Sequence, residues 1–358
     1  MRGLSGRFIE SRSGSLAPIL ILSMIPLLTA VGFSVDYTSA VQTRSNMQAA
    51  LDAGILAITT MPTTSTLPQR QVSLQDAFTA NGGEGTATLG SFVVSANGTA
   101  TAQATASYSM PTVFMKIARI DSVPVAVAAS VTKTPALVQT TFKVTKVSGY
   151  WGKTMTLYGT QFGATAAKPL MTITYAYNGF GDPKGYGTTT VNTITNNGGA
   201  DISTTVQKQV CTTTKVSSFK NAPAGSIQQT SGSNKYLTTC VDTFYPADGA
   251  GAVIDVSQMN ALYLQMDVPS GNPKVLKSND PATSNRLYIG TSTSDMPEVA
   301  TGQTVDIFTA VPCGVPSYQA WEDGGNAVPA AVSNADFFYN VNGKCDFNQR
   351  PSDTVLTQ

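Results

Sequence analysis

The chain contains no histidine, and this removes a large part of enzyme chemistry. Serine–histidine triads, cysteine–histidine pairs, histidine-bearing zinc sites and imidazole bases all need that side chain. Carboxylate pairs, lysine nucleophiles and serine–lysine dyads need none, but the sequence does not present them as a set. The 22 Lys and Arg residues balance 21 Asp and Glu residues, whereas nucleic-acid binders usually carry a basic excess. We therefore expect no enzyme, no cofactor, no small-molecule substrate and no nucleic-acid partner.

The remaining reactive side chains are four cysteines in the C-terminal part of the chain: Cys211, Cys240, Cys313 and Cys345. Four cysteines allow three pairings, and their spacing favours the local pairs 211–240 and 313–345. No Cys-x-x-Cys motif occurs, which argues against a redox or zinc site. We predict structural disulfides, which persist outside reducing compartments.

Two loop segments could bind a ligand, and each has a simpler structural alternative. Asp280, in Ser278-Asn279-Asp280-Pro281, could bind Ca²⁺ through oxygens, although such a run more often forms a turn. Trp321, followed by Glu322-Asp323-Gly324-Gly325, could lie on an exposed sugar-binding loop, but a buried tryptophan beside a turn is favoured. We assign no metal site to either segment, and glycan and calcium binding stay open.

The elements that would position these groups begin with an uncharged, mostly apolar run from Ser13 to Val35. It is long enough to cross a bilayer, which takes about 20 helical residues. The residues before it are mainly basic: Arg2, Arg7 and Arg12 against Glu10. The positive-inside rule then makes residues 1–12 a cytoplasmic tail and 13–35 a transmembrane helix, with the rest across the membrane. A cleaved signal peptide and a prepilin-type leader are the alternatives, and the length of the run favours a retained anchor.

A second helix is predicted over residues 36–60, where Met47, Leu51, Ile55 and Ile58 recur on one face. This face could pack on the helix's own domain or on other membrane-anchored proteins. The residues alone leave both alternatives open, and we name these four as the candidate partner-packing face.

The residues of these two helices resemble a known family. Gly14-Ser15 stands at the start of the span, and Val31-Gly32 and Val35-Asp36-Tyr37 stand at its end. Arg44, Met47-Gln48-Ala49-Ala50 and Leu51-Asp52-Ala53 follow. This order resembles the N-terminal module of TadG-like proteins, in the TadE/TadG group of bacterial tight-adherence (Flp, type IVb) pilus assembly. Met47 stands where the family usually has Leu, and Leu51 and Gly54 replace common alanines. The resemblance is dense over about 50 residues and weak after residue 60.

Many TadG proteins also carry a von Willebrand factor A domain with a metal-binding Asp-x-Ser-x-Ser motif. Asp255-Val256-Ser257-Gln258-Met259 begins like this motif, but Met259 replaces its last serine. The α/β alternation of such a domain is missing as well. The resemblance therefore implies a short form without that domain, and its metal chemistry is not carried over.

The rest of the N-terminal module, residues 36–135, is predicted to be a small pilin-like α/β unit. The predicted elements are a helix at 70–79, a hairpin of strands 86–95 and 99–109 around Asn97-Gly98, a helix at 111–119 and a strand at 122–133. A spine helix would lie against the small sheet.

From residue 136 to residue 358 the helical periodicity disappears, and short β-type runs alternate with Gly, Asn, Pro and Asp. The predicted strands are 140–147, 154–159, 170–177, 188–194, 204–219, 235–244, 261–268, 286–289, 305–310 and 337–341. Their number and length favour a β-sandwich or a jelly-roll-like domain. The predicted fold class of the whole chain is α+β.

The resemblance implies a non-catalytic, membrane-anchored component of Flp pilus assembly. It would be a single-pass protein of the bacterial inner membrane, with its N-terminus cytoplasmic and its bulk periplasmic. The implied partners are TadE- or TadF-like membrane proteins and the lipid bilayer. The alternative is a membrane-anchored surface adhesin or carbohydrate-binding protein.

Overall fold

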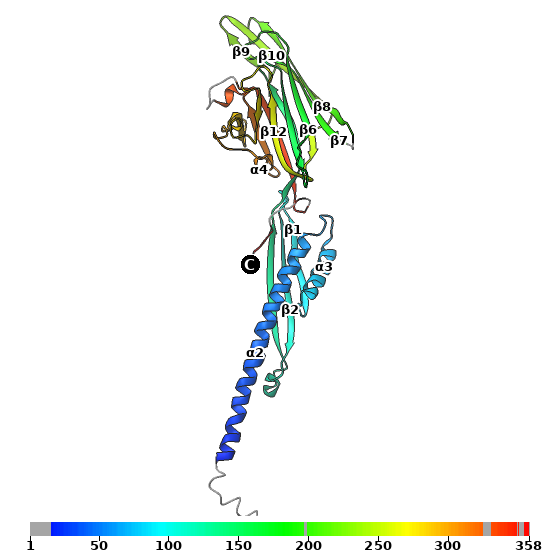
Figure 1. Ribbon diagram of the computed structural model, residues 1–358, viewed down its shortest axis with the longest axis vertical. Helices are drawn as coiled ribbons and strands as arrows, with labels where there is room; N and C mark the ends of the chain where they lie inside the picture. The colour runs from blue at the N-terminus through cyan, green and yellow to red at the C-terminus, as the bar shows by residue number, and fades with distance from the viewer. Residues whose placement is uncertain (1–15, 197–198, 325–330, 349, 351–353, 358) are drawn as a thin grey trace, which may run out of the picture. The chain divides into compact units, whose positions relative to one another are not determined.

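The computed structural model describes residues 16–196, 199–324, 331–348, 350 and 354–357 (Figure 1). The predicted cytoplasmic tail, 1–12, and the first residues of the predicted span lie outside the described residues. The chain divides into two compact units. The first unit holds Met1–Ser95, Thr99–Thr134 and Ser352–Gln358, and the second holds Ala96–Gly98 and Pro135–Pro351. The predicted α+β class is confirmed, with a long apolar N-terminal helix, large antiparallel sheets, 21% helix and 46% strand.

The first unit is a small sheet with helices on one face. Its elements are α2 (Leu16–Thr59), α3 (Leu67–Ala80), β1 (Thr86–Val94), β2 (Ala100–Pro111), the 3₁₀ turn η2 (Met115–Ala118), β3 (Ser122–Lys133) and β17 (Thr354–Leu356). The strands form one antiparallel sheet in the order β1-β2-β3-β17.

Helix α2 is one unbroken element of 44 residues that includes Pro26 and joins the two helices expected from the sequence. Its N-terminal part exposes apolar side chains: Leu20, Ile21, Leu22, Met24, Ile25, Leu27, Leu28, Val31 and Val35. Among the described residues, this is the helix long and apolar enough to cross a membrane. Its C-terminal part, from Asp36, buries one face instead, as the 3.6-residue periodicity predicts.

The buried face of the sheet is built from small side chains where α2 packs against it. On β2, alanines alternate with exposed polar residues, so that Ala100, Ala102, Ala104 and Ala106 all point inward. Alternate residues of a strand point to opposite faces, and short alanine side chains let a helix approach closely. The core that results contains Met47, Ala50, Leu51, Ile55, Ile58, Leu74, Phe78, Ala87, Ala102, Ala104, Ala106, Met110, Val125, Val127, Ala129 and Val131. Gly54 adds to this fit, because a Cβ there would lie 3.2 Å from the Leu74 side chain.

Two buried cations satisfy the last carbonyls of α2. Arg70 on α3 donates to the carbonyl of Ile58 and, at 2.8 Å, to that of Pro62, and Lys133 on β3 donates to that of Thr59 at 3.3 Å. The final carbonyls of a helix lack partners within the helix and carry partial negative charge. Both cations therefore fix the C-terminal end of α2 to its own domain.

The second unit is a sandwich of two antiparallel sheets. One sheet has eight strands in the order β13-β12-β5-β6-β7-β8-β10-β9, and the other has five in the order β11-β4-β16-β15-β14. The strands are β4 (Ala136–Val147), β5 (Lys153–Gln161), β6 (Lys168–Tyr177), β7 (Gly187–Asn196), β8 (Asp201–Val216), β9 (Ile227–Ser231), β10 (Asn234–Phe244), β11 (Ala252–Asp255), β12 (Met259–Asp267), β13 (Val275–Lys277), β14 (Leu287–Gly290), β15 (Pro316–Trp321) and β16 (Phe337–Asp346). Short helical turns complete it: η3 (Ser284–Arg286), α4 (Ile307–Ala310) and η4 (Val332–Asn334). Inward side chains from both sheets share one core, as in a sandwich.

Two elements differ from the sequence prediction. The helix expected at 111–119 is reduced to η2, because β2 continues to Pro111, which pairs with Ser122 of β3. The strand expected at 305–310 is instead α4, since the carboxylate of Asp306 caps it by accepting the amide of Phe308. The prediction also missed β9, β11, β13, β15 and β17.

The buried face of α2 leads to a stability prediction. Replacing Leu51, which is completely buried, with Arg should lower the free energy of unfolding of the first unit by roughly 3–5 kcal/mol, because the charge would lack a partner. The measurement is thermal or urea unfolding of the full chain in detergent. Val72→Arg is the control, because Val72 on α3 is 60% exposed. Equal stability of the two variants would contradict the packing described for α2.

Candidate functional site

Asp36 lies where α2 changes from exposed apolar side chains to a one-sided packing face. Its carboxylate accepts three consecutive backbone N–H groups of the loop between β2 and β3: Val113 at 3.1 Å, Phe114 at 2.9 Å and Met115 at 2.6 Å. The side chain is buried. Burial opposes ionisation, but the three amide donors outweigh it and hold the pKa of Asp36 below its ordinary value of 3.8. The carboxylate therefore fastens the loop to α2 as an anion.

One turn earlier, Gly32 provides the space for this contact. A Cβ at Gly32 would lie 2.5 Å from the Cβ of Phe114, closer than real Cβ atoms approach one another. Gly32 and Asp36 are four residues apart and so lie on the same face of the helix. The two residues, which the sequence offers only as parts of a family pattern, thus form one docking point for a loop far along the chain.

The candidate partner-packing residues lie elsewhere. Met47, Leu51, Ile55 and Ile58 are all completely buried in the core of the first unit, against α3 and the sheet. This geometry favours the first of the two alternatives, packing on the helix's own domain. A partner of α2 would have to contact its exposed residues instead, among them Tyr37 and Val41, which are 67% and 52% exposed.

The four cysteines form two disulfides, in the local pairs that their spacing favours. Cys211 on β8 lies directly opposite Cys240 on β10, with 4.0 Å between their Cα atoms. Cys313 joins Cys345 of β16 across a Cα–Cα distance of 5.5 Å. In the chain-entropy model, loops of about 30 residues contribute about 3–4 kcal/mol each to stability.

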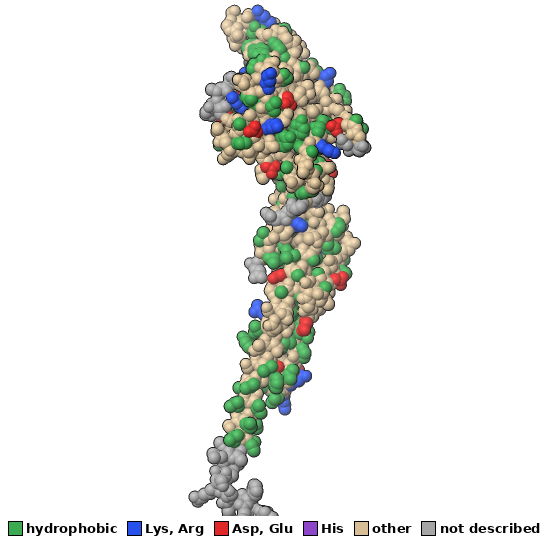
Figure 2. All heavy atoms as spheres, in the orientation of Figure 1, with side chains coloured by type: hydrophobic (Ala, Val, Ile, Leu, Met, Phe, Trp, Pro, Cys, Tyr) green, Lys and Arg blue, Asp and Glu red, His purple; other side chains and the backbone are tan. Residues whose placement is uncertain are grey.

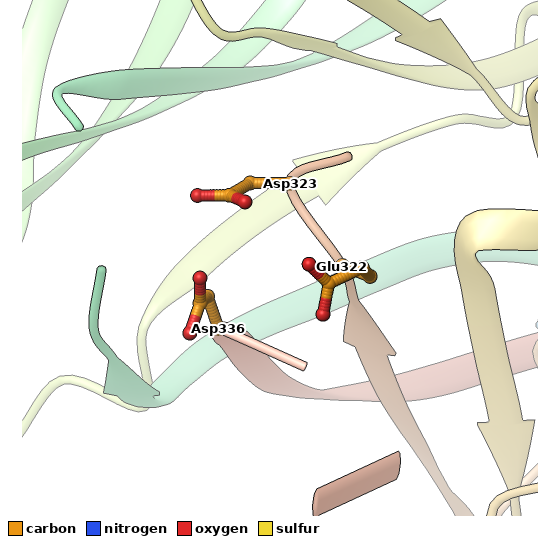
Figure 3. Close-up of side chains that lie close together, drawn as sticks. All are labelled: Glu322, Asp323 and Asp336. Atoms are coloured by element: carbon orange, nitrogen blue, oxygen red, sulfur yellow. The ribbon is translucent and has the colours of Figure 1, made fainter. Parts of the chain in front are cut away.

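The second unit contains an acidic cluster, formed by Glu322 and Asp323 after β15 and Asp336 before β16. One oxygen from each lies within 4.8 Å of the others, and Figure 3 shows the three carboxylates facing a common space. Lys153, at the start of β5, has a fully buried side chain and places its Nζ atom 2.7 Å from Asp323 and 3.6 Å from Asp336.

This cluster resembles a metal site in its acids, but the chain's own cation, Lys153, already pairs with two of them. Lys153 Nζ also donates to the carbonyl of Ser148 at 2.8 Å. Burial raises the pKa of Asp336 above its ordinary value, although the charge of Lys153 opposes this effect. Tyr150, Trp151 and Lys184 line a cavity of about 300 Å³ beside the cluster. The arrangement is a buried ion-pair network that joins β5 to β15 and β16.

Three other residues have structural roles. Trp321 is completely buried, and its indole N–H donates to the hydroxyl of Tyr339 at 3.1 Å, so the favoured interpretation of a core tryptophan is confirmed. Asp280 accepts the amide of Ala282 in a turn. Asp255 likewise accepts the amide of Ser257, two residues ahead. No local pattern marks the Lys153 network, because Lys153 and Asp323 lie 170 residues apart in the chain.

Comparison with known proteins agrees with the N-terminal geometry. Residues 14–57 match the model of the TadE/G-like Flp pilus-assembly family. No curated protein matches the chain, and no solved structure matches it. The resemblance seen in the sequence is therefore confirmed for this segment, which includes both Gly32 and Asp36. The match connects the chain with Flp pilus assembly, and its one long apolar N-terminal helix suggests membrane anchoring.

The amide contacts of Asp36 predict a pH dependence. Because the folded pKa lies below the ordinary value of 3.8, the stabilisation is fully present above that value and is lost as the pH falls through the lower folded pKa. Hydrogen-exchange protection of the amides of 113–115 should therefore decrease under acid. Asp36→Asn should show weak protection already at neutral pH and little further change. Protection in the variant equal to that of the wild type would contradict this role.

The buried ion pair predicts a second effect. Lys153→Met should lower the free energy of unfolding by about 3–5 kcal/mol, because it leaves buried carboxylates without their cation. Lys208→Met, at an exposed position of β8 in the same sheet, is the matched control. Added Ca²⁺ should leave the unfolding midpoint of the wild type unchanged, since the Lys153 ammonium already pairs with Asp323 and Asp336. A midpoint that rises with Ca²⁺ in the wild type would contradict this interpretation.

Proposed function

We propose that this protein is a non-catalytic, membrane-anchored component of Flp pilus assembly. Residues 16–35 of α2 cross the inner membrane, with the N-terminus in the cytoplasm and the chain after residue 35 in the periplasm. The partners are related membrane proteins of the TadE or TadF type, and the protein acts by packing beside them.

The observation that carries this proposal is the family match over 14–57 on a helix whose N-terminal part exposes apolar side chains. Exposed apolar residues on this scale are costly in water and mark a surface covered by lipid or protein. Two disulfides agree with an oxidising compartment such as the periplasm. The sugar-binding alternative loses its main candidate residue, because Trp321 is buried.

The exposed face of α2 gives the packing hypothesis a specific surface. Tyr37, Val41 and Arg44 line a shallow hollow together with Val123 and Pro124 of β3. Val41 is 52% exposed beside β3 and is not part of the domain core, so a substitution there should spare the fold. We expect related subunits to pack against this face rather than against the buried one.

The experiment replaces the chromosomal gene with variants and measures protein level, co-purified pilus-assembly proteins and surface pili. Deletion should abolish surface pili. Val41→Arg should accumulate at the wild-type level, because the position is exposed, but should lose its partners and most of the pili, since an apolar contact would now bury a charge.

Val72→Arg on α3 is the matched control and should behave as the wild type. Normal piliation of the deletion strain would overturn the assembly role. If the deletion strain lacks surface pili but the Val41→Arg strain has normal pili, the assembly role stands and the proposed packing surface is wrong. Binding of the detergent-solubilised full chain to a glycan array, with pili unaffected by deletion, would favour the adhesin.

A further inference from the structure

The loop between β2 and β3, residues 112–121, carries an apolar surface that faces away from the domain core. Val113 and Ile117 are 72% and 71% exposed, and Phe114 and Ile120 are each 42% exposed. Four large apolar side chains exposed within eight consecutive residues are unusual for a loop in water. Phe114 and Ile120 are partly covered by the described chain, but most of the surface of Val113 and Ile117 is left open to surroundings outside it.

The position of this loop along α2 suggests what those surroundings are. Phe114 packs at Gly32, and Asp36 holds the amides of 113–115. Twenty residues from Leu16 to Val35 span about 30 Å, the thickness of the hydrocarbon core. Gly32 then lies about 5 Å inside the boundary that Val35 marks, at a rise of about 1.5 Å per residue. The loop is therefore held at the depth where a bilayer changes from headgroups to acyl chains.

The loop also has the composition of a segment that lies in a membrane interface. The basic residues Lys116 and Arg119 are exposed among its apolar side chains. Interfacial segments commonly bury apolar side chains about 5–10 Å deep while lysine and arginine reach the phosphates. Figure 2 shows apolar side chains gathered along the lower part of α2 and the segment beside it, with basic side chains nearby.

We propose that residues 112–121 insert into the outer interface of the same bilayer that α2 crosses, as a second contact with the lipid. This inference rests on the proposed membrane anchoring of α2. The bilayer is favoured over a protein partner because the apolar surface of the loop is continuous with that of the span, through Phe114 at Gly32. Val113 and Ile117 enter the acyl boundary, and Lys116 and Arg119 bind lipid phosphates. The contact fixes the depth of α2 and the orientation of the small sheet on the membrane.

The test places an environment-sensitive fluorophore on single introduced cysteines in the full chain, reconstituted in vesicles of phosphatidylethanolamine and phosphatidylglycerol. Ile117→Cys reports on the loop, Leu28→Cys on the span, and Val72→Cys on a comparably exposed position of the same unit. Nitroxide-bearing lipid quenches a probe in the bilayer, and iodide quenches a probe in water. All three positions are exposed, so the label should not disturb the fold.

We expect the probe at 117 to be quenched by nitroxide lipid and protected from iodide, as at 28, while the probe at 72 shows the reverse. Iodide quenching at 117 with lipid quenching at 28 would overturn the inference and leave the anchor intact. Protection at 117 from both quenchers would indicate a protein contact and also overturn it. Absence of lipid quenching at 28 would show that α2 does not cross the bilayer, and both proposals would fail.

Discussion

The contact between the Asp36 carboxylate and three successive amides organises the first compact unit. It is charge-assisted and buried, and it joins α2 to a loop 77 to 79 residues later in the chain. Arg70 and Lys133 hold the other end of the helix through its final carbonyls. Contacts at both positions oppose sliding and rotation of the helix on the sheet. The sheet in turn needs only a smooth apolar face, which its alanines and valines provide.

One helix therefore carries two patterns without a break between them. Before Asp36, most apolar residues are exposed; after it, most of the large apolar residues are buried on one face. Asp36 is the first charged residue after Arg12, so the carboxylate lies at the change of pattern. An aspartate suits this place, because its short side chain reaches neighbouring amides without leaving the helix surface. A loop whose amides point at the helix can then pack there without leaving its donors unsatisfied.

Much of this organisation follows from local pattern. The apolar run, the periodicity of Met47 and Leu51, the alternation in β2 and β3 and the cysteine spacing each reflect a regular repeat or a short loop. What escaped prediction depends on pairs distant in sequence. Lys153 meets Asp323 and Asp336 only after β5, β15 and β16 have assembled, and no local signal marks a buried lysine. The helix expected at 111–119 failed for a related reason, since β2 continues to Pro111 and pairs there with Ser122 of β3.

The family match ends at residue 57, yet its residues Gly32 and Asp36 make their contacts with residues 113–115, well outside the matched segment. The pattern Gly32…Val35-Asp36 is therefore more than a description of a membrane helix and its flank. A glycine is needed where a loop side chain approaches within van der Waals distance, and an acid is needed where three amides converge. Replacing Gly32 and Asp36 could leave an apolar helix of the same length, but the loop at 113–115 would lose its contacts with that helix. Gly32 and Asp36 thus encode a tertiary contact between α2 and the loop that follows β2. This contact joins the apolar part of α2 directly to the small sheet.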